Sequence, residues 1–163
     1  MPSTLDIRNF TRSQVPRFPF KEALQAALPG WELSLAFAGE TRAKQMNMQL
    51  RDKDYVPNVL SYESGNKSGE IVICLQIAKK QAPSYGMSYT EFVGLLFIHG
   101  CLHLKGERHG ATMDTKERLL LKRFISPSSA PSNNVPTNRN RNRHRHAPDE
   151  SRGGRGGAGT RRA

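Results

Sequence analysis

A run of apolar residues from Phe92 to Leu104 constrains the fold of this chain more than any other segment. It contains no Asp, Glu, Lys or Arg, and it is too short for a membrane span but typical of a buried core helix. The preceding residues 88–91, Ser-Tyr-Thr-Glu, have the form of a capping box, and Gly106 stands where a helix commonly ends. The pattern predicts a helix that starts at residue 89 or 90 and ends at Leu104. Apolar side chains lie on nearly every side of it, so we expect it to run through the middle of the core.

Three of the five histidines of the chain fall at the end of this segment. His99 and His103 are four residues apart, which places them one turn above each other on the same helix face. Gly106 permits a sharp reversal that would bring His109 back to the same point. Three imidazole ligands with an open fourth position are the catalytic type of zinc site, in which the pKa of a bound water falls to about 7. A single histidine on an apolar helix is more often an ordinary hydrogen-bonded residue, but the whole pattern favours one metal ion held by all three.

The same spacing occurs in the metzincin proteases, which place a catalytic glutamate directly after the first histidine. Here that residue is Gly100, so the general base of peptide hydrolysis is missing and a peptidase is not favoured.

Cys101 is about 200° around an ideal helix from His99 and should point into the core instead of toward a metal. Cys74 also lies among apolar residues, and both cysteines are interpreted as buried free thiols of a reducing compartment.

The length of 163 residues suits one domain with tails, and a mean hydropathy of -0.62 indicates that part of the chain does not fold. We expect a single domain over residues 1–125, whose first 19 residues form a loosely packed lead-in interrupted by prolines. Residues 126–163 begin Ser/Pro-rich, become Arg/Gly-rich and carry eight arginines, so they are interpreted as a disordered basic tail. The net charge of +11 indicates a polyanionic partner such as nucleic acid.

The rest of the domain alternates between predicted helices and strands. Residues 70–75 are β-branched and almost continuously apolar, as in a central strand buried on both faces. A second capping pattern, Asp114 to Glu117, predicts the start of a helix that runs to Phe124. The remaining expected elements are helices at 21–28, 41–50 and 76–81, strands at 31–37 and 58–62, and a charged loop at 51–57.

Several of these segments together resemble the YbeY family, the bacterial rRNA maturation endoribonucleases. The resemblance rests on residues 51–54 (Arg-Asp-Lys-Asp), 58–62 (Asn-Val-Leu-Ser-Tyr), 69–74 (Gly-Glu-Ile-Val-Ile-Cys) and 99–109, which occur in the order of the family. It implies an α/β fold of the α+β type, with a small mixed sheet packed against helices around the histidine-bearing helix. It further implies one zinc ion, a cytoplasmic location, and action on single-stranded RNA in the 3′-end maturation of 16S rRNA and in ribosome quality control.

Residue by residue, the resemblance implies that His99, His103 and His109 are the zinc ligands and that Arg51 faces the RNA phosphate. A guanidinium suits this task because it stabilises the charge that develops on phosphate oxygens; the alternative for Arg51 is an ordinary solvated cation. One position departs from the family pattern, since Arg108 stands where an acidic residue is usual. If that carboxylate orients a ligand imidazole, its loss should weaken metal binding.

The sequence thus favours a zinc-dependent, single-strand-specific endoribonuclease whose partners are rRNA and the small ribosomal subunit. The alternative is a ribosome- or RNA-binding factor with weak or lost hydrolase activity, suggested by Arg108 and by the Arg-Gly-Gly repeats of the tail. The N-terminus has no apolar segment typical of a signal peptide, and no membrane association is expected. The basic tail is predicted to bind RNA electrostatically, or else to act only as a solubilising extension.

Overall fold

The computed structural model describes residues 1–125. The predicted disordered tail, 126–163, lies outside the described residues. The elements in chain order are β1 (Thr4–Asn9), α1 (Phe20–Ala27), β2 (Glu32–Phe37), α2 (Glu40–Arg51), β3 (Val59–Gly65), β4 (Ser68–Ile73), α3 (Leu75–Gln81), the 3-10 turn η1 (Ala82–Tyr85), α4 (Tyr89–Leu104) and α5 (Ala111–Phe124).

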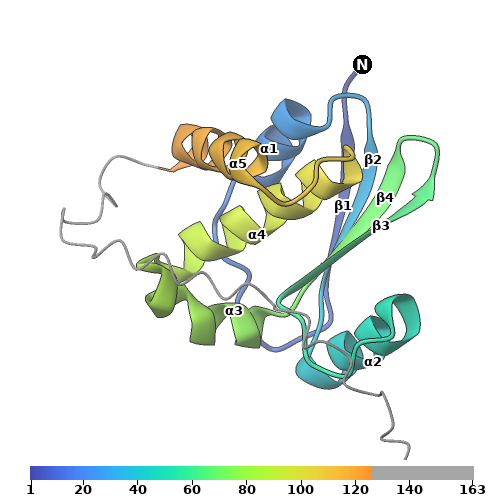
Figure 1. The fold of residues 1–163 in the computed structure, drawn as a ribbon, viewed down its shortest axis with the longest axis vertical. Coiled ribbons are helices and arrows are strands. Elements are labelled where there is room, and N and C mark those ends of the chain that lie inside the picture. Colours follow the sequence, from blue (N-terminus) through green and yellow to red (C-terminus); the bar gives the residue numbers. More distant parts are fainter. Residues whose placement is uncertain (126–163) are drawn as a thin grey trace, which may run out of the picture. The chain divides into compact units, whose positions relative to one another are not determined.

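The strands form one mixed sheet in the order β1-β2-β4-β3 (Figure 1). Strand β2 pairs in parallel with both β1 and β4, whereas β3 pairs with β4 in antiparallel register. The central strand β4 is buried on both faces, as its continuous apolar sequence predicts: Ile71 and Ile73 join the main core, and Val72 joins a smaller cluster on the opposite face. The predicted α/β fold with a small mixed sheet is confirmed.

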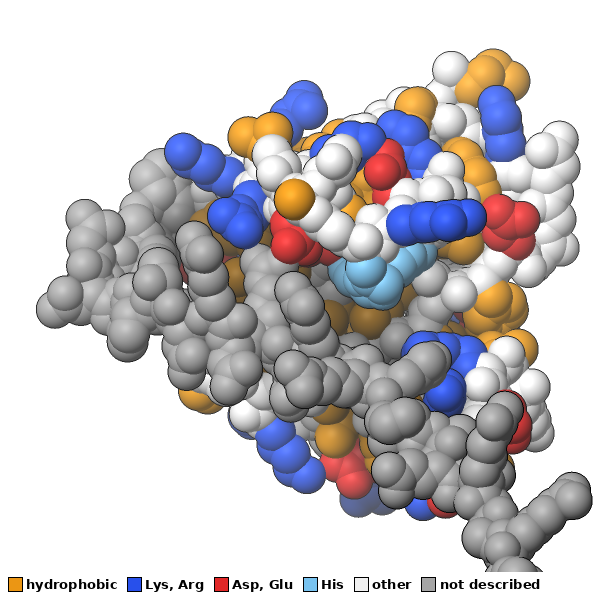
Figure 2. Space-filling view, in the orientation of Figure 1, with side chains coloured by type: hydrophobic (Ala, Val, Ile, Leu, Met, Phe, Trp, Pro, Cys, Tyr) orange, Lys and Arg blue, Asp and Glu red, His pale blue; other side chains and the backbone are white. Residues whose placement is uncertain are grey.

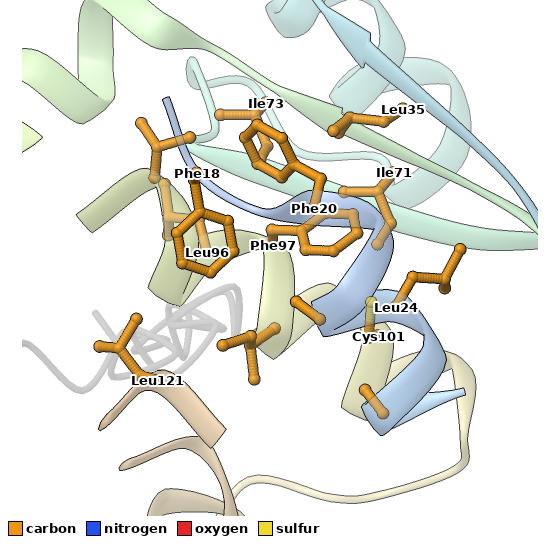
Figure 3. Close-up of a cluster of buried hydrophobic side chains, with 14 of the residues drawn as sticks. Phe18, Phe20, Leu24, Leu35, Ile71, Ile73, Leu96, Phe97, Cys101 and Leu121 are labelled. Atoms are coloured by element: carbon orange, nitrogen blue, oxygen red, sulfur yellow. The ribbon is translucent and has the colours of Figure 1, made fainter. Parts of the chain in front are cut away.

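Helix α4 is the central element of the main core, as its all-round apolarity predicts. It lies between the sheet and the helices α1 and α5 (Figure 1). Aromatic rings from different segments meet there, and the Phe20 ring contacts the Phe97 ring edge to face at 5.2 Å between centroids (Figure 3). Within residues 1–125, no helix is both long enough and apolar enough to cross a membrane.

Both ends of α4 follow the local signals of the sequence. At the start, the Ser88 hydroxyl accepts a hydrogen bond from the Glu91 amide at 3.2 Å. At the end, Gly106 has a left-handed backbone with φ of +97°, and its amide donates to the His103 carbonyl at 2.9 Å. The Glu107 amide donates to the Leu102 carbonyl at 3.0 Å, which completes a Schellman motif. This reversal turns the chain after α4 back toward the histidines.

Residues 1–19, predicted as an extended or loosely packed lead-in, are more tightly integrated into the domain than the sequence predicts. Residues 4–9 form the edge strand β1, and Phe18 is buried in the main core. Ser3 is also buried, and its hydroxyl donates to the Leu28 carbonyl at 2.7 Å. The strand is mostly exposed, and although Leu5 and Ile7 alternate with polar residues, two apolar side chains are only a weak strand signal. Its pairing with the distant strand β2 makes it a strand.

Helix α2 is close to its predicted range. The sequence favours Ala43, Met46, Met48 and Leu50 as its packing residues, and that prediction is only partly right. Ala43 is buried, whereas Met48 and Leu50 are 43% and 49% exposed. Asn47 is completely buried and was not predicted to pack. The helix therefore buries a narrow face against the small second cluster, and its last turn carries exposed side chains.

Candidate metal centre

The three predicted histidine ligands come together at one end of α4. His99 and His103 lie on the last turns of the helix, and His109 lies in the connection to α5. One nitrogen from each ring falls within 4.8 Å of the others, and the Nε2 atoms of His99 and His103 are 2.9 Å apart. Four tetrahedral nitrogen ligands of zinc stand about 3.3 Å from one another. The cluster is thus of the right size to hold one metal ion.

The outer nitrogens of the first two rings decide the chemical state of the inner ones. The Nδ1 of His99 contacts the Glu117 carboxylate, and the Nδ1 of His103 lies 3.2 Å from the Glu107 carbonyl oxygen. Both partners are acceptors, so each Nδ1 carries the proton and donates it. The two Nε2 atoms then face each other at 2.9 Å, an arrangement that suits a shared cation. The donor set fits a metal of the zinc type.

The imidazoles of His103 and His109 are also kept in the neutral state that metal binding requires. Burial, with the nearby rings of His99 and His109, lowers the pKa of His103 to about 4. Burial and His99 likewise lower the pKa of His109. At neutral pH both rings therefore offer an unprotonated nitrogen.

Gly100 stands where the proteases have their glutamate, and the space beside it is filled by a side chain of the sheet. A Cβ atom added to Gly100 would stand 2.9 Å from Cδ1 and 3.2 Å from Cγ1 of Ile71 on β4. Gly100 thus allows α4 to lie close against the central strand, and the structure leaves no room there for a catalytic carboxylate. Cys101 points into the core, as predicted, and burial raises the pKa of its thiol (Figure 3).

Helix α5 begins earlier than the sequence predicts and contributes a residue to the site. It starts at Ala111, so the capping box predicted at 114–117 is wrong. The side chain of Glu117 turns instead to the Nδ1 of His99. Its neighbour Lys116 pairs with the side-chain carboxylate of Glu107. The backbone carbonyl of the same glutamate accepts from the Nδ1 of His103.

Arg108, the departure from the family pattern, is an exposed residue. The carboxylate next to it in sequence, that of Glu107, contacts Lys116 and not an imidazole. The acid that contacts a ligand ring is Glu117, eight residues after His109. His99 thus has a carboxylate partner although residue 108 is an arginine. The weaker metal binding expected from Arg108 stays a prediction.

Arg51 is the last residue of α2, whereas the sequence predicts it as the first residue of the loop that follows. Asp52 follows with a left-handed backbone, and the buried side chain of Asn47 donates to the Tyr55 carbonyl at 3.0 Å, which fixes the turn. Arg51 is exposed, and its positive charge adds to the lowering of the pKa of His109. The guanidinium is thus within electrostatic range of the histidine cluster. Figure 2 shows the histidines as one patch at the surface, with Lys and Arg side chains around it.

Fold and cluster together define a class: small α/β proteins in which a buried helix and the turn after it present three histidines able to hold one metal ion. Comparison with known proteins gives the family. The family model described as Endoribonuclease YbeY matches residues 6–125, and this chain belongs to that family.

Curated relatives agree with this assignment. Endoribonuclease YbeY of Bdellovibrio bacteriovorus is 32% identical over 120 residues, which cover 72% of this chain and 77% of the relative. Endoribonuclease YbeY of Thiobacillus denitrificans is 34% identical over 106 residues, covering 59% and 72%. A solution structure of a Thermotoga maritima protein shares the fold with a TM-score of 0.53 at 23% identity, covering 72% of this chain and 87% of that one.

Proposed function

We propose that this protein is a zinc-dependent endoribonuclease that cleaves single-stranded RNA. The observation that carries the proposal is the convergence of His99, His103 and His109, with one ring nitrogen of each within 4.8 Å of the others. Membership of an endoribonuclease family supplies the substrate class. Zinc suits the site because it accepts three imidazole nitrogens and keeps a fourth position open for water.

In this proposal the protein's own residues prepare the site for attack on a phosphodiester. The three imidazoles hold the metal, which when bound supplies an acidified water and Lewis acidity. Arg51 lies within electrostatic range of His109 and would bind a phosphate oxygen, where its planar guanidinium can make two hydrogen bonds. Since charge grows on those oxygens during cleavage, the contact would be stronger in the transition state than in the bound substrate.

The biological setting is proposed on the same basis. We place the activity in a domain over residues 1–125, in the cytoplasm, with 16S rRNA at its 3′ end as substrate and the small ribosomal subunit as partner. A role in ribosome quality control follows from this substrate. The proposal for residues 126–163 is electrostatic RNA binding by their eight arginines.

Substitution of Arg51 tests the proposed phosphate contact. We expect Arg51→Ala to lower the rate of cleavage of a single-stranded RNA by about 10²–10³-fold, with the zinc content unchanged. Arg51→Lys should recover only part of the loss, because an ammonium keeps the charge but not the paired hydrogen bonds. The measurement is single-turnover cleavage of an end-labelled RNA, with the same sequence as a duplex serving as the resistant substrate.

Arg42→Ala is the matched control, because Arg42 lies on the same helix but packs over the Phe10 ring, 4.6 Å from its centroid. Its cleavage rate should stay near that of the unmodified protein. Equal rates for Arg51→Ala and the unmodified protein would make Arg51 an ordinary solvated cation. Equal cleavage of the duplex would contradict the single-strand specificity.

A further inference from the structure

Glu117 is a buried acid that nothing in the proposed reaction uses. Glu117 is only 8% exposed. It lies on α5 between the buried residues Met113 and Leu121, on the helix face that packs inward. A carboxylate in such a place is costly to bury unless a charged or hydrogen-bonding partner offsets its desolvation. A methionine or leucine would suit an apolar stripe better, so a contact specific to the carboxylate is needed to explain the glutamate.

The carboxylate of Glu117 contacts the Nδ1 of His99. The other nitrogen of the same ring, Nε2, points to the centre of the cluster. This bond fixes two properties of the imidazole. It holds the proton on Nδ1, which leaves the lone pair on Nε2, and it prevents the ring from turning about its side-chain bonds.

The two neighbouring rings have different partners at the corresponding place. His103 donates its Nδ1 proton to the backbone carbonyl of Glu107, which carries no net charge. His109 is exposed, and the negative charges of Glu117 and Asp114 oppose the lowering of its pKa by burial. The Glu117 carboxylate is thus a partner of another kind than the backbone carbonyl that His103 contacts.

We propose that Glu117 is a positioning residue for metal binding: by accepting the Nδ1 proton of His99, it sets the tautomer and orientation of one ligand. The inference rests on the proposed function, because it assumes that the cluster holds zinc. It places part of the site on α5, a helix that supplies no ligand of its own. Packing of α5 against α4 then becomes a condition for tight metal binding.

The test compares zinc affinity in Glu117→Gln and Glu117→Met by competition with a chromophoric chelator. Partners of this kind are commonly worth about 10–100-fold in metal affinity, so we expect zinc binding to weaken by that factor in Glu117→Gln and at least as much in Glu117→Met. Cobalt replaces zinc in a parallel measurement, and the visible absorption of the cobalt-loaded protein should change shape because one ligand ring is reoriented. Glu63→Gln is the control, because Glu63 is exposed on β3 and its replacement removes the same charge from a surface position.

Glu117→Met also separates this role from a structural one. Methionine completes the apolar stripe, so the metal-free variant should melt at or above the temperature of the metal-free unmodified protein. Weaker zinc binding in a variant of undiminished stability supports the proposal. Unchanged zinc affinity and cobalt absorption in both variants, beside an unmodified protein that binds zinc, would overturn the inference and leave the proposed function intact. An unmodified protein that takes up no zinc would overturn both.

Discussion

His103→Ala is expected to abolish zinc binding at the cluster and to lower RNA cleavage by about 10³-fold or more. The Nε2 of His103 lies 2.9 Å from that of His99, so its removal takes away a central member of the three. Acidification of the attacking water and charge stabilisation by a metal are worth several kcal/mol, and each 1.36 kcal/mol is a factor of ten in rate. The measurements are zinc content by elemental analysis and single-turnover cleavage of a single-stranded RNA.

The matched control is His144→Ala, which removes a histidine outside the described residues and the cluster. It should retain both zinc and cleavage. The metal-free forms of both variants should melt close to the metal-free unmodified protein, because His103 is only half-buried and alanine is a good helix former. If His103→Ala cleaves as fast as the unmodified protein, the activity does not come from this site.

Gly100→Glu is expected to lower the free energy of unfolding by about 3 kcal/mol or more. The new side chain would start 2.9 Å from Ile71, between α4 and the central strand, and would bury a carboxylate among apolar groups. Overpacking of a core typically costs about 1–3 kcal/mol, and the desolvation of an unpaired charge adds several more. Chemical denaturation of the metal-free proteins measures the change.

Leu119→Glu introduces the same residue at a helix position that is 65% exposed, and its stability should change by about 0.5 kcal/mol or less. Gly100→Ala should fall between the two, since alanine gains helix propensity but still meets Ile71. A Gly100→Glu protein as stable as the unmodified one would contradict the close packing of α4 on β4. The experiment also asks directly why this site lacks the protease glutamate.

Local sequence signals were sufficient for the part of the site that lies on α4. The Ser88 cap, the apolar residues after it and the left-handed Gly106 each act within a few residues, and the structure has each of them where the sequence predicts. The four-residue spacing of His99 and His103 fixes their common helix face in the same way. His109 needed one further step, the chain reversal at Gly106, which is also local.

The features that the sequence did not predict depend on contacts between distant segments. Strand β1 has few apolar residues and is defined by its pairing with β2. Glu117 fits a capping box by its local pattern, but Gly110 and Ala111 start the helix a turn earlier and turn its side chain toward His99. One signal was available: Met113, Glu117 and Leu121 are four residues apart, and an acid within a buried stripe requires a partner.

The most direct test of the proposed zinc chemistry is a titration of metal-free protein with zinc, followed by cleavage of a fixed amount of single-stranded RNA. One site formed by three histidines predicts no cleavage without metal, a linear rise as zinc is added, and a plateau at one equivalent per chain. The same titration of His103→Ala should stay flat. Full cleavage by the metal-free protein, or a rise that continues well beyond one equivalent, would contradict the account.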